Sequence, residues 1–145
     1  MSAAGKRRIL AVDFGDRRTG LAATDPTGTI VVPLTALVTQ TAAECARAVA
    51  ALARERDAEI VVVGVPLDAK GQAGQRARRT LAFVELLRPL APCAVTTVDE
   101  SETTNLAHEL LKEAGLKAAR RKQLADSVAA MQILERYRQR PQRPG

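Results

Sequence analysis

The sequence predicts an α/β domain with a five-stranded mixed sheet and helices on both faces. Ile9–Val12 and Ile60–Val63 are unbroken apolar runs, and a third buried strand is expected at Ala94–Val98. Apolar runs of this length indicate strands that are covered on both faces. Amphipathic helical segments separate the three runs, and this alternation is typical of parallel strands joined by right-handed helical crossovers.

The composition is that of one soluble globular domain. The chain has 145 residues, of which 46% are hydrophobic and 26% charged, so residues 1–140 are expected to form a single domain with its own core. We expect residues 141–145 to be a disordered tail. Aromatic residues make up only 2% of the chain, which argues against domains that read RNA by stacking bases on aromatic side chains.

The location of the protein is expected to be the cytoplasm. The apolar stretch after the basic N-terminal residues is too short for a signal peptide, and no segment approaches the length of a membrane span. Cys45 and Cys93 are the only cysteines and lie far apart, in a predicted helix and a predicted strand. We expect two buried free thiols in a reducing compartment and no contact with a membrane.

The first half of the sheet is predicted as a central strand followed by a hairpin. Ile9–Asp13 is the central strand, Gly20–Thr24 is the second strand, and Asp25–Gly28 has the composition of a turn. Ile30–Val32 completes the hairpin. Pro33 lacks a backbone donor, so this third strand is expected at the edge of the sheet.

Two helices are predicted between the later strands. Thr41 and Glu44 have the spacing of a capping box, and the helix that they open ends at Arg54–Arg56. The second helix is expected from Gln75 to Arg88. Its inward face is predicted to consist of Ala77, Leu81, Val84 and Leu87.

The last part of the chain is predicted to be helical. A short helix capped by Thr103 or Thr104 is expected to stop at Gly115, and a longer helix follows from about Arg121 to Arg138. His108 is the only histidine and is interpreted as a surface residue of the short helix.

Three carboxylates are the candidate catalytic residues. Asp13 and the Asp99–Glu100 pair each follow a predicted parallel strand, so they are expected at one edge of the sheet. Asp126 aligns with the apolar face of the last helix. Converging carboxylates repel one another unless cations lie between them, and oxygen ligands favour Mg²⁺ or Mn²⁺. Such a centre is suited to hydrolysing phosphodiester bonds.

Two of these carboxylates also have structural interpretations. Asp13 could cap the turn after its strand, and Asp126 could be a first-turn residue that complements the helix dipole. Basic residues offer a second signal, because residues 117–145 carry eight Lys or Arg against Asp126 and Glu135, and the rest of the chain is neutral. This excess of 8 − 2 = 6 positive charges favours a polyanionic partner, although a solvated basic tail is the alternative.

Four motifs, in order, resemble the YqgF family over residues 7–138. They are ILAVDFGDRRTGLAATDPTGTIVVPL, IVVVGVPLDAKGQAGQRARRTLAF, TVDESETT and RRKQLADSVAAMQILERY. The resemblance implies a ribonuclease-H-like fold related to Holliday-junction resolvases, and a nuclease that matures the 5′ end of the small-subunit ribosomal RNA precursor. It also implies that Asp13, Glu100 and Asp126 form the acidic site, in agreement with the reasoning from the residues.

The chain departs from the family pattern at three positions. Ser101 stands where the family usually has Arg, Lys70 where an acidic residue is usual, and Ala73 where Glu is common. Lys70, Arg17 or Arg18 could supply the positive charge that Ser101 lacks beside the scissile phosphate. The remaining residues expected to contact phosphates are Arg76, Arg79, Arg120, Arg121 and Lys122.

Alternative functions remain open at this point. DFGDRRTG resembles the phosphate loop of sugar-kinase and actin-like ATPases, but those proteins enclose a nucleotide between two such domains and this chain supplies one. A non-catalytic RNA-binding module would keep the fold and the basic tail. A resolvase would act on branched DNA in place of RNA.

Overall fold

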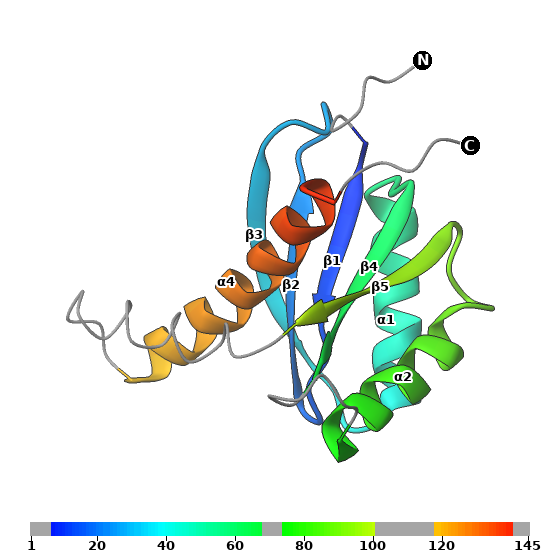
Figure 1. Cartoon of the computed structure of the whole chain (residues 1–145), viewed down its shortest axis with the longest axis vertical. Helices are drawn as coiled ribbons and strands as arrows, with labels where there is room; N and C mark the ends of the chain where they lie inside the picture. The colour runs from blue at the N-terminus through cyan, green and yellow to red at the C-terminus, as the bar shows by residue number, and fades with distance from the viewer. Residues whose placement is uncertain (1–6, 68–73, 101–117, 141–145) are drawn as a thin grey trace.

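The computed structural model describes residues 7–67, 74–100 and 118–140, with the side chains of 118–125 excluded. The described part contains a five-stranded sheet in the order β3-β2-β1-β4-β5 (Figure 1). Its strands are β1 (Ile9–Asp13), β2 (Arg18–Thr24), β3 (Val31–Val38), β4 (Ile60–Pro66) and β5 (Ala94–Glu100). The described helices are α1 (Ala42–Glu55), α2 (Gln75–Leu87) and α4 (Ala118–Arg138).

The mixed sheet has β1 at its centre, as predicted. β1 pairs antiparallel with β2, so that Asp13 lies opposite Gly20, and parallel with β4, where Val12 lies opposite Val63. The hairpin strand β3 is at one edge. Pro33 pairs with Ala22 there, in agreement with the expectation that a residue without a backbone donor occupies an edge strand.

Two apolar clusters cover the two faces of the sheet. Alternate side chains of β1 divide between them, because successive residues of a strand point to opposite faces. Leu10 and Val12 belong to the cluster that includes α1 and α2, whereas Ile9 and Ala11 belong to the cluster that includes α4. The prediction of helices on both faces is therefore confirmed, and Figure 1 shows α4 crossing its face of the sheet.

The capping box predicted at the start of α1 is present. Thr41 is the N-cap, and the Glu44 backbone N–H donates to Thr41 Oγ1 at 3.1 Å. The Glu44 carboxylate in turn accepts from the backbone N–H of Gln40, at 3.1 Å. Both interactions satisfy donors that a helix start would otherwise leave unpaired.

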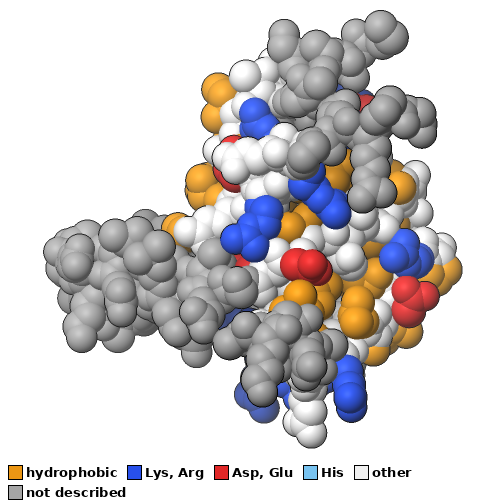
Figure 2. Space-filling model, viewed as in Figure 1, with side chains coloured by type: hydrophobic (Ala, Val, Ile, Leu, Met, Phe, Trp, Pro, Cys, Tyr) orange, Lys and Arg blue, Asp and Glu red, His pale blue; other side chains and the backbone are white. Residues whose placement is uncertain are grey.

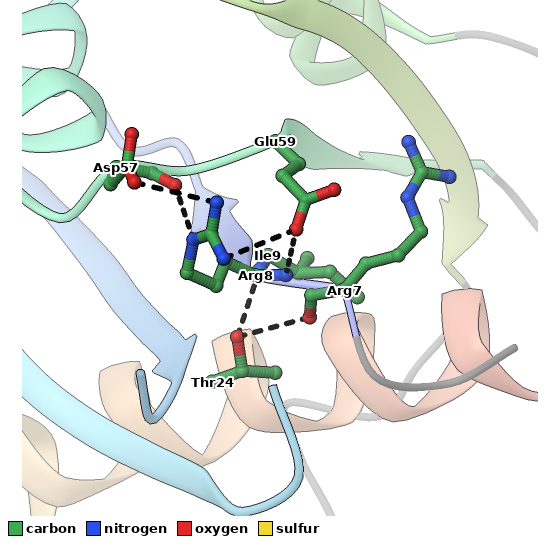
Figure 3. Close-up of polar contacts among 6 residues, drawn as sticks. All are labelled: Arg7, Arg8, Ile9, Thr24, Asp57 and Glu59. Carbon is green, nitrogen blue, oxygen red and sulfur yellow. Dashed lines mark hydrogen bonds and ion pairs between the residues drawn. The ribbon is translucent and has the colours of Figure 1, made fainter. Parts of the chain in front are cut away.

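The start of β1 is held by polar contacts on both sides (Figure 3). The Ile9 N–H donates to Thr24 Oγ1 at 2.8 Å, across to β2. Arg8 forms ion pairs with Asp57, at 3.4 Å, and with Glu59, at 3.6 Å. These contacts fix the register of β1, and therefore the position of Asp13 at its other end.

The core differs from the prediction in two details. The third strand is only partly buried, because Val95 and Val98 belong to the clusters on opposite faces of the sheet but Ala94 and Asp99 of this second edge strand are exposed. Leu81 of α2 is 41% exposed, and Thr80 and Phe83 are buried in its place. The Phe83 ring stacks on Phe14, with centroids 4.4 Å apart, so an aromatic contact sets the rotation of α2.

Several expectations fall on residues outside the described ranges. They are the short helix that ends at Gly115, His108, Ser101, Lys70 and the tail at 141–145. Both cysteines are free thiols, with Cys45 buried and Cys93 only half-buried. No helix in residues 7–67, 74–100 and 118–140 has the length and apolar character needed to cross a membrane.

Candidate active site

Asp13 lies at the carboxyl end of the central strand, on the face that α4 covers. Ile9 and Ala11 pack with α4, and the period of two in a strand places Asp13 on the same face. The end of β5 contributes Glu100 to this face as well, because Val98 belongs to the α4 cluster and Glu100 is two residues further on. Topology alone therefore directs two of the three predicted carboxylates toward α4.

Two glycines bring the remaining groups close to Asp13. Gly20, the antiparallel partner of Asp13, packs so tightly under α4 that a methyl group there would overlap the Asp126 backbone carbonyl. Gly64 follows Val63 in β4. A methyl group on Gly64 would collide with Ile133 and lie 2.9 Å from Glu100 Oε2. Asp13 thus lies between two glycines of the neighbouring strands. Gly20 adjoins the backbone of Asp126, and Gly64 adjoins the carboxylate of Glu100.

The electrostatics of Asp13 reflect this arrangement. The pKa of its carboxyl is raised from 3.8 to about 7, first by burial and second by the negative charge of Glu100. The Arg76 guanidinium lowers this pKa, and the Asp126 carboxylate raises it. All three charged groups therefore act on Asp13, and additional positive charge nearby would favour its ionised form.

Asp126 is in the middle of its helix and not at the start. α4 begins at Ala118, eight residues earlier, so the interpretation of Asp126 as a first-turn residue is wrong. Its Oδ2 atom forms an ion pair with Arg18 Nε at 2.9 Å. Ala129 and Ala130, one turn on, are fully buried, which lets this part of α4 lie close to the sheet.

The turn after β1 is organised by a hydroxyl group from β2. The backbone N–H of Gly15 donates to Thr19 Oγ1 at 3.4 Å, and Thr19 itself is buried beside Cys45. The side chain of Asp13 lies on the opposite, α4 face. This placement favours a role in the acidic site over the role of a turn cap.

The basic residues predicted to bind phosphates divide into three groups. Arg76 and Arg79 are exposed at the start of α2, and Arg79 pairs with Asp16 at 3.3 Å. They line a small pocket of about 30 Å³ beside the exit of β1. Arg17 is exposed, and Arg18 is held by Asp126. Lys70 and the side chains of Arg120, Arg121 and Lys122 lie outside the described part of the structure.

The acidic residues fit a hard divalent cation by their chemistry. All three supply carboxylate oxygens, the donors that Mg²⁺ and Mn²⁺ prefer, and the pKa of the half-buried Asp13 is raised by burial and by the nearby carboxylates. In the described ranges, no three Asp, Glu, His or Cys side chains are gathered closely enough to hold a metal ion. Asp126 points to Arg18, so a bound cation would have to compete with this guanidinium.

A family model shows to which protein family the chain belongs. A family model described as "RuvX: Holliday junction resolvase" matches residues 7–140. The chain belongs to the RuvX family. The resemblance found in the four sequence motifs is thereby confirmed.

Relatives of this RuvX chain share about a third of its residues over almost its whole length. A protein from Chloroflexus aggregans is 36% identical over 132 residues, which cover 91% of this chain and 93% of that protein. A protein from Clostridium novyi is 32% identical over 130 residues, which cover 90% and 96%. Both carry the name "Putative pre-16S rRNA nuclease".

Solved structures confirm the ribonuclease-H-like fold of this RuvX chain. Thermus thermophilus RuvC in complex with a Holliday junction substrate has a TM-score of 0.56 at 17% identity, covering 90% of this chain and 94% of that chain. The fowlpox virus resolvase with Holliday junction DNA has a TM-score of 0.52 at 11% identity, covering 92% and 99%.

Sequence reasoning missed the two glycines that shape this RuvX site. Local patterns predict Gly20 only as the start of the second strand and assign Gly64 no role in the site. The available signal was a glycine inside an otherwise apolar β-branched segment, which often marks a close approach of another part of the chain. The partnership of Arg18 with Asp126 joins residues 108 positions apart and has no local signal.

Proposed function

We propose that this chain is a metal-dependent nuclease in which Asp13, Glu100 and Asp126 hold Mg²⁺ or Mn²⁺. The observation that carries the proposal is the position of Asp13 between Gly20 and Gly64. These glycines place the Asp126 backbone and the Glu100 carboxylate directly beside the strands that flank it. Carboxylates from β1, β5 and α4 lie near the end of the central strand, and they would bind a cation together once Asp126 turns away from Arg18.

The reaction is hydrolysis of a phosphodiester bond. A divalent cation bound at these carboxylates would make water more acidic and offset negative charge on the reacting phosphate. Asp13 and Glu100 would orient the cation from the sheet, and Asp126 from the helix that crosses it. Arg18, when displaced from Asp126, would be free to donate to a phosphate oxygen.

The substrate that we propose is the precursor of the small-subunit ribosomal RNA, cleaved in maturation of its 5′ end. Support comes from the names of relatives that align over nearly the whole chain. Phosphate contacts are proposed for two groups of basic residues. One group is Arg17, Arg18, Arg76 and Arg79, the other is Arg120, Arg121 and Lys122 at the start of α4, and Lys70, outside the described residues, is proposed with them.

Cleavage of branched DNA is the second candidate. It is favoured by the description of the family model and by structural neighbours that were solved with Holliday junctions. RNA and DNA substrates share the phosphodiester chemistry, so the same carboxylates would serve either one. A third candidate, an RNA-binding module without catalysis, predicts binding with no cleavage.

A single assay separates these candidates. Labelled ribosomal-precursor RNA and a four-way DNA junction are incubated with Mn²⁺ and either the wild-type protein or Asp13→Asn. The proposal expects wild type to cleave the RNA and the variant to leave it intact while binding it. Cleavage confined to the junction would favour the resolvase. Binding without cleavage by both proteins would favour the module.

A further inference from the structure

The edge strand β5 has an unusual set of partners along its outer side. Its inner side faces β4, where the Glu100 carbonyl accepts from the Leu67 N–H at 3.0 Å. Carbonyls alternate in direction along a strand, so those of Val95, Thr97 and Asp99 point away from β4. An edge strand normally exposes such groups to solvent or to another chain.

Each of these three carbonyls accepts a hydrogen bond from an arginine. Arg88 Nη1 donates to Val95 O at 2.7 Å, and Arg136 Nη1 donates to Asp99 O at 2.6 Å. Between them, Arg140 Nη1 lies 3.5 Å from Thr97 O. We call Arg88, Arg140 and Arg136 the arginine edge.

The spacing of the helix matches the spacing of the strand. Arg136 and Arg140 are four residues apart in and just after α4, about 6 Å along a helix axis. Their acceptors, Asp99 and Thr97, are two residues apart in β5, about 6.6 Å along a strand. The side chains of two consecutive turns can therefore reach consecutive outward carbonyls, and Arg88 continues the series from the end of α2.

The arginine edge keeps most of its charge and donors available. A backbone carbonyl uses one N–H of a guanidinium, which has five, and carries no formal charge to neutralise it. All three residues are exposed. Arg88 also pairs with Glu85 at 3.0 Å. This exposed pair offsets the charge of Arg88 alone, the arginine whose acceptor on β5 is farthest from Glu100. Figure 2 shows several Lys and Arg side chains on the face that carries α4 and β5.

The arginine edge leads toward the candidate active site. Along β5 the acceptors run from Val95 through Thr97 to Asp99, and the next residue is Glu100. Arg136 and Glu100 line the same pocket of about 240 Å³, together with Gln132, Ile133, Glu135 and Gln139. Among the described residues, Gln132 Oε1 is buried beside this pocket with no hydrogen-bond donor.

We propose that the arginine edge binds successive phosphates of a single RNA strand and leads that strand to the carboxylates at Asp13 and Glu100. The inference rests on the proposed nuclease function and specifies the form of its substrate. Guanidinium groups fixed at regular intervals on a rigid strand lose little entropy on binding phosphates that are also regularly spaced. The arginine edge supplies one line of donors, which matches the one backbone that a single strand presents.

The competing interpretation is that the arginines only protect the edge of the sheet. Capped carbonyls and positive charge both discourage pairing with another chain. In that case, loss of an arginine would promote association of the protein but leave its affinity for RNA unchanged. The two interpretations therefore differ in whether RNA binding requires the positive charge of the arginines.

The experiment measures binding of a labelled single-stranded RNA at several salt concentrations, in the Asp13→Asn background so that cleavage does not interfere. Arg136→Gln with Arg140→Gln keeps an N–H donor at both positions and removes both charges. We expect the slope of log affinity against log salt to fall by about 1.4, or 0.7 for each lost contact on a single strand. Arg136→Lys with Arg140→Lys keeps the charges and should retain most of the slope.

Arg47→Gln is the matched control, because Arg47 is exposed on α1 and not on the β5 edge. This control should leave the slope unchanged. An unchanged slope in the double Gln variant, or equal losses in the Gln and Lys variants, would overturn the proposal. Because binding is measured without turnover, a changed slope with no cleavage by wild type would count against the nuclease and not against the arginine edge.

Discussion

Arg18 and Asp126 join the start of β2 to the middle of α4 through an ion pair of 2.9 Å between Nε and Oδ2. The pair holds Asp126 beside Gly20, the residue opposite Asp13 in the sheet. It also gives Asp126 a cationic partner that a metal ion would have to replace. The proposed metal site is therefore in competition with an internal guanidinium.

Arg18→Gln is expected to raise the affinity for Mn²⁺ by roughly two- to fivefold, the range that corresponds to a partly exposed ion pair. Cleavage should nevertheless be slower, because Arg18 would no longer contact the phosphate. Calorimetric titration with Mn²⁺ and a single-turnover assay measure the two effects. Weaker Mn²⁺ binding in the variant would mean that Arg18 positions Asp126 for the metal and does not compete with it.

Substitution of the two glycines should displace the site. Gly20→Ala and Gly64→Ala are each expected to destabilise the fold by about 1–3 kcal/mol, because a methyl group at either position meets α4 or its contacts. Gly74→Ala is the control for steric overlap, since no atom lies within 4 Å of the added methyl group and only the smaller N-cap preference of α2 changes. Chemical denaturation measures the three free energies of unfolding. If Gly20→Ala and Gly64→Ala destabilise the protein no more than Gly74→Ala does, α4 can move away from the added methyl group at no cost in free energy of unfolding.

The raised pKa of Asp13 predicts a pH-dependent stability. Between its ordinary value of 3.8 and about 7, the folded protein keeps a proton that the unfolded chain releases. The free energy of unfolding should therefore fall as the pH rises through this window, and stay lowered above pH 7.

Asp13→Asn removes this dependence. In metal-free buffer the variant should equal wild type near pH 4 and exceed it at pH 8 by at least about 1 kcal/mol. Denaturation curves in EDTA at the two pH values test the difference. If the variant is much less stable than wild type at both, Asp13 has a structural role in the turn instead.

Arg120 and Arg121 lie in the first turn of α4 and are predicted to contact phosphates. Replacing both with Ala should weaken binding to all RNA sequences alike, because phosphate contacts carry no sequence information. The salt dependence on single strands should flatten by about 0.7 log units per decade for each residue. An unchanged slope would assign these residues to a solvated surface.

Much of this architecture could be predicted from local patterns. The unbroken apolar runs at Ile9–Val12 and Ile60–Val63 are the two innermost parallel strands, and Pro33 marks an edge. The same reasoning placed Asp13 and Glu100 on one edge of the sheet. These predictions succeeded because burial on both faces of a strand leaves a signal in consecutive residues.

The errors have a different physical origin. Leu81 was assigned to the core by its spacing, but the stacking of Phe14 on Phe83 rotates α2 so that Leu81 faces solvent. The third strand is predicted as buried, but Ala94 and Asp99 are exposed because β5 is an edge strand, where among the described residues arginine side chains reach the outward carbonyls. Contacts between elements distant in sequence decided both cases, and no periodicity within one element reports them.

The most direct test of the metal site is a crystal structure of the protein soaked in Mn²⁺, with the ion located by its anomalous scattering. We predict one or two peaks bound by Asp13, Glu100 and Asp126, separated by about 3.5–4 Å if there are two. Arg18 should then be displaced from Asp126. A fully soaked crystal with no anomalous peak at these carboxylates, or with Mn²⁺ bound only elsewhere, would contradict the account.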